Sequence, residues 1–228
     1  MPGPIVLFDI GATLIEGPTQ TPARFLAARL GLDETNRKRL DRQLLTSEID
    51  SPSRLAALLT AEYGVAGTEA TAAAAAVWAT QETGPAPIPG AREVLGALRA
   101  GGVRYGFVSN IWHPYACSFA RLFGELAASE VAIFSYRAGI AKPDPALYRH
   151  ALAAAGCRPE DATMVGDTYE NDIAPAIALG LRTVWLLHRP DKERAELEGV
   201  ERGTLPRPDL MLPSIADLTL AHFTATHR

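Results

Sequence analysis

The sequence has little that would support a disulfide-bonded, nucleic-acid-binding or membrane-spanning protein. Its two cysteines, Cys117 and Cys157, offer neither a disulfide framework nor a metal-binding pair, so we expect both to stay reduced. The formal net charge of −4 provides no general attraction for nucleic-acid phosphates. No stretch approaches the roughly 20 apolar residues that cross a membrane, and residues 1–9 lack the basic region of a secretory signal. We therefore expect a cytoplasmic protein with neither nucleic acid nor membrane as a partner.

From Pro89 onward, short apolar runs alternate with helical patterns, which is typical of a parallel sheet with helices between its strands. Val94, Leu95 and Leu98 have helical spacing, as do Tyr148, Ala151, Leu152 and Ala155 further along. The pattern predicts an α/β, Rossmann-like fold. Its expected strands are residues 5–8, 103–108, 131–134, 163–165 and 183–187.

Residues 16–84 follow a different pattern, because their apolar positions have helical spacing and no β-branched run interrupts them. Clusters of glycine and proline lie at both ends, at residues 17–18 and 84–90, where hinges are expected. The sequence therefore predicts a core made of residues 1–15 and 85–228, with residues 16–84 inserted as an all-helical cap.

Acidic residues follow two of the expected strands. Asp9 comes directly after residues 5–8, and Asp167 follows residues 163–165. The carboxyl edge of a parallel sheet is where open α/β folds bind ligands, so the two carboxylates are expected to converge there. Asp9 can act as a nucleophile, and a pair of carboxylates can bind a hard cation such as Mg²⁺. The alternative for Asp9 is a turn residue, and Asp172 has two roles open to it, support of the metal site or a helix cap.

Three further polar residues lie where a phosphate could be bound. Lys142 precedes Pro143, in a loop before a helix expected to begin near Pro145, where a fixed ammonium can neutralise a transferring group. Ser109 and Asn110 follow another expected strand, and their hydroxyl, amide and backbone N–H groups can bind phosphate oxygens. The alternatives are a solvated surface lysine and a helix N-cap.

The order and spacing of these segments closely resemble the haloacid dehalogenase superfamily over nearly the whole chain. The resemblance is most specific in residues 139–145 and 166–172. It implies that Asp9 is the nucleophile, that Thr13, Ser109 and Lys142 handle the phosphate, and that residues 16–84 form a helical cap of the first type. It also implies a Mg²⁺ site made by Asp9, the carbonyl of Gly11, Asp167 and Asp172. Asn110, Gly11 and Ala12 complete the expected substrate-binding residues.

Gly11 departs from that resemblance. The family's phosphatases carry a second Asp there, which protonates the leaving alcohol and then activates water. Relatives without it include the haloacid dehalogenases, which use no metal, expel an unprotonated halide and bind substrate with a cap arginine. Arg37, Arg39 and Arg42 lie where such an arginine would come, and Tyr148 has the spacing of a dehalogenase tyrosine. The retained Asp167 counts against that reaction, and the arginines can equally form a solvated, mixed-charge helix face.

Other residues near the motifs are candidates to replace the lost acid or to act as a cap nucleophile. Lys38 is the one lysine before Lys142 and thus the only cap candidate for a Schiff base, as in a phosphonatase. Glu16 fits a hinge better than a replacement acid. Trp112 and His113 could line the cavity mouth, although His113 before Pro114 also fits a helix start.

The sequence thus predicts a hydrolase, namely a Mg²⁺-dependent phosphatase that acts on a small phosphorylated metabolite through an aspartyl-phosphate intermediate. Without an acid at Gly11 it should favour good leaving groups such as acyl or aryl phosphates. Two alternatives stay open: a metal-independent hydrolase similar to the 2-haloacid dehalogenases, and a non-catalytic relative that binds a phosphorylated ligand or a protein.

Overall fold

A computed structural model describes residues 3–224 of the chain. Within that range, one sheet of six parallel strands has the order β5-β4-β1-β6-β7-β8. The strands are β1 (Ile5–Phe8), β4 (Arg104–Ser109), β5 (Ala132–Phe134), β6 (Ala162–Gly166), β7 (Arg182–Leu186) and β8 (Leu210–Leu212). The α/β, Rossmann-like fold predicted from the sequence is confirmed, and the five expected strands lie within one residue of their observed ends. The sequence analysis missed β8.

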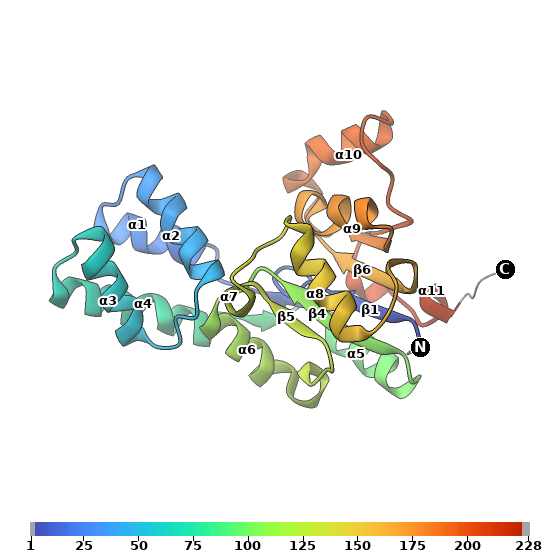
Figure 1. Cartoon of the computed structure of the whole chain (residues 1–228), viewed down its shortest axis with the longest axis horizontal. Helices are drawn as coiled ribbons and strands as arrows, with labels where there is room; N and C mark the ends of the chain where they lie inside the picture. Colours follow the sequence, from blue (N-terminus) through green and yellow to red (C-terminus); the bar gives the residue numbers. More distant parts are fainter. Residues whose placement is uncertain (1–2, 225–228) are drawn as a thin grey trace.

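Helices cover both faces of this sheet (Figure 1). Alternate residues of β1 point to opposite faces, as in any strand. Val6 and Phe8 pack with α5 (Ala91–Ala100) and α6 (His113–Phe123), whereas Ile5 and Leu7 pack with α8 (Pro145–Ala155) and α9 (Ala174–Leu179). β1 is buried along its whole length, which explains its unbroken apolar run. The expected stripes of α5 and α8 are buried in these two layers.

The remaining helices are shorter or peripheral: α7 (Ser135–Ala138), α10 (Arg194–Glu201) and α11 (Ala221–Thr224). A π-helical turn, Tyr169–Ile173, follows β6. In the described part of the chain, none of the helices combines the length and apolar character needed to cross a bilayer.

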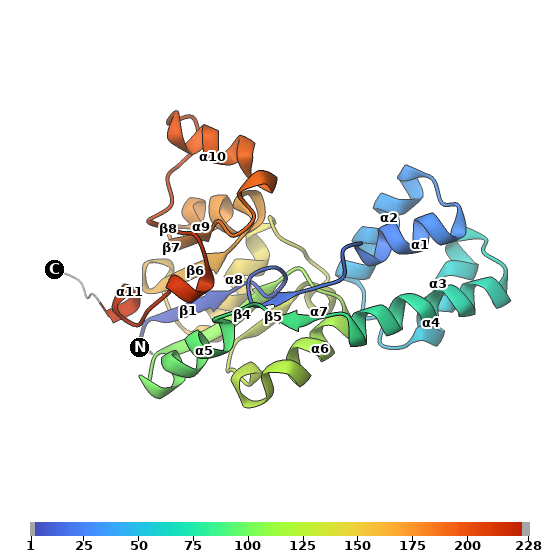
Figure 2. The same ribbon diagram turned by 180° about the vertical axis from the view of Figure 1, so that it is seen from behind.

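Four helices lie beside the sheet rather than on it, as both views show (Figure 2). They are α1 (Pro22–Leu30), α2 (Glu34–Thr46), α3 (Pro52–Tyr63) and α4 (Gly67–Thr83). The side chains of Thr21, Asp33 and Ser51 cap the first three by accepting backbone N–H bonds. The four helices enclose a hydrophobic cluster of their own, which includes Leu26 and Leu59.

The chain enters and leaves this helical part through two short strands, β2 (Ile15–Glu16) and β3 (Ala86–Pro87), which pair antiparallel. We expected no strand within residues 16–84. That expectation is wrong for Glu16, which belongs to β2, whereas β3 lies outside the range. The pairing was missed because each strand has only two residues. The division into a core and a cap at residues 15/16 and 84/85 stays a prediction.

The C-terminal end of α4 is fixed to α6. The Trp112 indole Nε1 donates to Gln81 Oε1 (3.0 Å), and the Ser118 hydroxyl donates to the Gln81 carbonyl (2.7 Å). Trp112 also joins the hydrophobic cluster of the four helices. The helical part is therefore anchored at the edge of the sheet where β4 ends.

Candidate active site

The carboxyl ends of three neighbouring strands bring the polar residues together. Asp9 follows β1, Ser109 ends β4 and Asp167 follows β6, and these strands are adjacent in the sheet. A pocket of about 190 Å³ opens at this edge. Its lining residues are Asp9, Gly11, Asn110, Lys142, Thr168, Asn171 and Asp172.

Three buried carboxylates form the centre of the site. Asp9, Asp167 and Asp172 each place a carboxylate oxygen within 4.8 Å of the others. Burial raises the pKa of Asp167 to about 7, with the charges of Asp172 and Asp9 adding to the effect and Arg189 opposing it. Burial likewise raises the pKa of Asp172 to about 6, against the opposing effect of Lys142. Such a cluster is stable as anions only beside cations.

Lys142 supplies one of these cations. Its Nζ donates to Asp9 Oδ1 (2.5 Å), Asp172 Oδ1 (2.6 Å) and the Val108 carbonyl (3.0 Å), so all three of its protons are used. Burial alone would lower the pKa of this ammonium, but Asp172 and Asp9 outweigh it and raise the pKa. Lys142 is only 5% exposed. The alternative of a solvated surface lysine is wrong.

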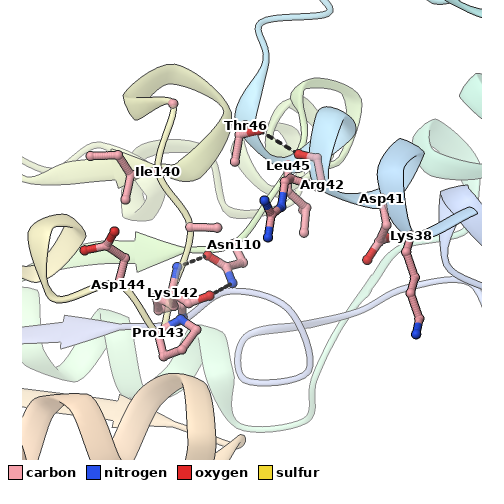
Figure 3. Close-up of a pocket in the computed structure, with 12 residues that line it drawn as sticks. Lys38, Asp41, Arg42, Leu45, Thr46, Asn110, Ile140, Lys142, Pro143 and Asp144 are labelled. Carbon is pink, nitrogen blue, oxygen red and sulfur yellow. Dashed lines mark hydrogen bonds between the residues drawn. The ribbon is translucent and has the colours of Figure 1, made fainter. Parts of the chain in front are cut away.

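The amide of Asn110 holds the backbone of Lys142 in place. The Lys142 N–H donates to Asn110 Oδ1 (2.7 Å), and Asn110 Nδ2 donates to the Lys142 carbonyl (2.9 Å), as Figure 3 shows. Asp144 caps α8 by accepting the Ala146 N–H, which fixes the other end of the same loop. The Asn110 side chain, predicted to bind substrate, is thus occupied in positioning Lys142.

Ser109 has a hydroxyl that nothing satisfies. Its Oγ is buried, and no group in residues 3–224 forms a hydrogen bond with it. The helix-cap alternative is wrong for Ser109 and Asn110, because α6 begins at His113 with Trp112 as its N-cap and no side-chain cap bond. A buried hydroxyl without a partner is unusual, and an anionic ligand in the pocket would satisfy it.

The loop after Asp9 lies directly beside the carboxylates. Thr13 is buried and its hydroxyl donates to Asp167 Oδ1 (3.4 Å). Ala12 adopts a left-handed conformation (φ 57°), which non-glycine residues rarely take. At Gly11 the backbone has no such constraint, and a Cβ added there would meet only the ring edge of Tyr115, at 3.8 Å. The fold therefore does not require glycine at position 11.

Asp172 lies within the π-helical turn that follows β6. Its Oδ2 accepts the Thr168 N–H (3.0 Å), while its Oδ1 accepts from Lys142. The cap alternative for Asp172 is wrong, since α9 begins at Ala174 and has no side-chain cap bond. Asp172 therefore fixes the ammonium of Lys142, and it also belongs to the cluster of three carboxylates.

A sequence model of the haloacid dehalogenase-like hydrolases matches residues 5–180. The chain belongs to this family.

Among curated relatives, a phosphoserine phosphatase of Thermus thermophilus is 36% identical over 96 residues, 40% of this chain and 33% of its own length. A ribulose-1,5-bisphosphate 5-phosphatase of Halopiger xanaduensis is 30% identical over 133 residues, 58% of this chain and 55% of its own. The chain thus spans between a third and about half of the length of these relatives.

Solved structures of the haloacid dehalogenase-like family match over more of the chain. A hydrolase of Deinococcus radiodurans with bound phosphate and sodium is 25% identical, with a TM-score of 0.62 and coverage of 97% of this chain and 96% of that one. CbbY of Rhodobacter sphaeroides with phosphate has a TM-score of 0.64 at 22% identity, covering 97% and 99%. Two haloacid dehalogenases share the fold at 22% and 15% identity.

Arg189, which the sequence analysis missed, also belongs to this haloacid dehalogenase-like site. It lies three residues beyond the end of β7, and its Nη2 donates to Asp167 Oδ2. Its Nε is buried without a partner in the described residues. Its position could have identified it, because Arg189 comes shortly after the expected strand 183–187, as Asp9 and Asp167 come shortly after theirs.

The arginines predicted as dehalogenase candidates divide into two kinds. Arg39 pairs with Glu62 on α3 and is exposed, as the alternative of a solvated helix face predicted, whereas Arg37 pairs with Glu34 but is half-buried. Arg42 lines a cavity of about 600 Å³ between α2 and the loop of Lys142, together with Lys38 and Asp41. Figure 3 shows the Arg42 guanidinium directed into the space above Asn110, whereas the Lys38 amine points away from it.

The remaining candidates lie outside the pocket. Glu16 belongs to β2, at the entry to the helical part, and is exposed. His113 starts α6, with its Nε2 3.4 Å from Cys117 Sγ, and it does not line the 190 Å³ pocket. Tyr148 is buried beneath Lys142, donates its hydroxyl proton to the Asn171 carbonyl and has a pKa raised by burial.

Proposed function

We propose that this chain is a Mg²⁺-dependent phosphatase that acts on a small phosphorylated metabolite through an aspartyl-phosphate intermediate on Asp9. The observation that carries the proposal is the arrangement around Asp9. One of its oxygens accepts from Lys142, no described group donates to the other, and the side chain lines the 190 Å³ pocket. The phosphatase names of several relatives support the same reaction.

The donor set suits a hard divalent cation. Three buried carboxylates with oxygens within 4.8 Å of one another are the ligands that Mg²⁺ prefers. Asp9, the carbonyl of Gly11 and Asp167 would hold the ion, and Asp172 would support it by fixing Lys142. A bound cation would screen the repulsion between an anionic phosphate and the Asp9 carboxylate.

In the proposed reaction, Asp9 attacks phosphorus, and the leaving oxygen departs with the electron pair of the broken P–O bond. Water then attacks the phosphorus of this aspartyl phosphate, which breaks the P–O bond to Asp9, regenerates the Asp9 carboxylate and releases phosphate, with the proton of the water passing to solvent. Lys142 and the free hydroxyl of Ser109 would stabilise charge on the transferring group, with Thr13 beside them. Because Gly11 cannot protonate the leaving oxygen, acyl and aryl phosphates should react faster than alkyl phosphates.

The four helices of residues 16–84 would serve as the cap over the core of residues 1–15 and 85–228. The 600 Å³ cavity between α2 and the Lys142 loop, and the polar residues of α2 that line it, support this role. A cap in this position would exclude water from the strand ends when it closes.

The test is phosphate release from acetyl phosphate with Mg²⁺, with EDTA, and in Asp9→Asn. We expect turnover that EDTA abolishes and that Asp9→Asn lacks, while Asp191→Asn, a change at an exposed carboxylate, keeps full activity. Persistent activity in Asp9→Asn would eliminate the nucleophile assignment. Tight Mg²⁺-dependent binding of phosphate without turnover would indicate the non-catalytic alternative.

A dehalogenase-like hydrolase is the second candidate, and Arg42 is the observation that favours it. Arg42 faces the Lys142 loop and forms no ion pair among the described residues. Halide release from 2-chloropropionate in EDTA, lost in Arg42→Met and kept in Arg39→Met, would select this reaction over the phosphatase.

A further inference from the structure

Each acid of the site has a cation from the protein itself. Lys142 serves Asp9 and Asp172, and Arg189 serves Asp167. Arg189 reaches Asp167 from the loop after β7 and keeps about a third of its side chain exposed. The backbone carbonyl of Asp167 accepts from the Trp185 indole (3.1 Å), which fixes the acid from behind. Arg189 is therefore the more exposed partner of the pair.

A divalent cation and Arg189 would compete for the same carboxylate. The guanidinium takes Asp167 Oδ2, and Asp167 Oδ1 accepts only a long bond from Thr13. Three carboxylates and two protein cations leave one negative charge, so a divalent ion added beside both cations would make the pocket net positive. Like charges in a partly desolvated site repel strongly. Displacement of Arg189 from Asp167 relieves that repulsion.

We propose that Arg189 is an exchangeable counter-cation of Asp167, which a divalent metal displaces and which then binds an oxyanion of the substrate in the cavity beside Gly11. This inference rests on the metal dependence of the proposed function.

A cavity beside Arg189 could hold an anion that the displaced guanidinium would bind. Arg189 lines a cavity of about 340 Å³ together with Gly11, Ala12 and Tyr115. Its buried Nε has no partner, so the guanidinium has hydrogen-bonding capacity to spare before any metal arrives. A planar guanidinium binds a phosphate or a carboxylate with two parallel N–H bonds. Metal binding thus creates an anion site next to the nucleophile, and the two events strengthen each other.

The first experiment measures Mg²⁺ binding alone, by calorimetry, in the unaltered chain, Arg189→Met and the control Arg194→Met. Arg194 pairs with the exposed Asp191 and touches none of the site's acids. Coupling between sites typically changes affinity about 5–150-fold. We expect Arg189→Met to bind Mg²⁺ tighter by a factor within that range and Arg194→Met to bind as the unaltered chain does. A supporting arginine would have the opposite effect, since its loss would loosen the site.

Equal or weaker Mg²⁺ binding in Arg189→Met would overturn the inference while leaving the metal-dependent function intact. Binding in Arg189→Met alone would show that Arg189 blocks the site without being displaced, and it would overturn both the inference and the Mg²⁺ dependence of the unaltered chain. Absence of binding in both proteins would refute both. If Arg189→Met fails to fold, Arg189→Lys, which keeps the charge but not the planar fork, should tighten Mg²⁺ binding by a smaller factor, and unchanged affinity would be contrary evidence.

The second experiment titrates inorganic phosphate at saturating Mg²⁺. Arg189→Met should bind phosphate more weakly than the unaltered chain, and without Mg²⁺ the two should differ little because Arg189 is then held by Asp167. Equal loss of phosphate affinity with and without Mg²⁺ would show that Arg189 binds the anion without exchange, and would overturn the proposal.

Discussion

Replacing Gly11 by Asp should convert the site from one that needs a good leaving group into one that does not. The structure permits the change. Gly11 has an ordinary backbone conformation, and the only atom near an added Cβ is Tyr115 Cε1 at 3.8 Å. The new carboxyl group would lie on the same loop as Asp9, at the edge of the cavity that Tyr115 and Arg189 line. Its position matches that of a proton donor to the leaving oxygen.

The expected size of the effect follows from what a positioned acid contributes. General acid assistance is worth about 10²–10⁴-fold, or roughly 3 to 5 kcal/mol of activation free energy. An alkoxide leaving group needs all of this assistance, whereas the acetate of acetyl phosphate leaves as a stable anion. We therefore expect kcat/KM for ethyl phosphate to rise about 10²-fold or more in Gly11→Asp, and kcat/KM for acetyl phosphate to change by less than about tenfold.

The assay is phosphate release from both substrates with saturating Mg²⁺, because kcat/KM reports the steps up to formation of the aspartyl phosphate on Asp9. Gly11→Asn is the control, since it has the shape of Asp without a transferable proton. Equal gains in Gly11→Asp and Gly11→Asn would refute the reasoning. So would an unchanged ratio between the two substrates in a Gly11→Asp protein that unfolds at the same temperature as the unaltered chain.

Three further predictions concern the charges and hydroxyls of the site. Lys142→Met leaves two buried carboxylates unpaired and should cost about 3–5 kcal/mol of unfolding free energy at pH 7; urea unfolding should show a smaller loss at pH 5, where the carboxylates take up protons. In the folded chain, Asp167 and Asp172 have pKa values of about 7 and about 6, above their ordinary 3.8. Without metal, the folded chain therefore binds more protons than the unfolded chain between these pH values. Its free energy of unfolding should fall as pH rises from about 4 to 7. Denaturation in EDTA across that range checks the slope, and Mg²⁺ should stabilise the protein more at pH 8 than at pH 5. Ser109→Ala removes a buried hydroxyl without a partner, so its unfolding free energy should stay equal or rise by about 1 kcal/mol while phosphate release falls; lower stability with unchanged turnover would contradict this role.

The sequence predicted the sheet well because β1 is an unbroken apolar run and the neighbouring strands β4 and β6 are mostly apolar and largely buried. β8 was missed because it has only three residues, half-buried at the edge of the sheet between Pro208 and Pro213. The β2–β3 pair was beyond reach because two-residue strands leave no periodicity.

The sequence could predict those residues of the candidate site that lie at the carboxyl end of a strand. Asp9, Ser109 and Asp167 obey that rule, and Arg189 obeys it as well but was passed over because no family motif marks it. The place of Asp172 could not be predicted, since a π-helical turn sets where its carboxylate points. The bond between Asn110 and the Lys142 backbone joins loops 32 residues apart, and no local pattern encodes such a contact.

The pairing of Ile15 with Pro87 has a consequence for how this chain can diversify. The chain leaves the core at Ile15 and returns to it at Pro87, and these two residues are paired. The residues between them therefore form a loop whose ends are held together. The entropic cost of closing such a loop grows only with the logarithm of its length. A longer, shorter or wholly different set of helices could replace α1–α4 between β2 and β3 without shifting any strand of the large sheet. Under the proposed function, exchange of these helices would change which substrate is bound, while the residues at the edge of the large sheet stay the same.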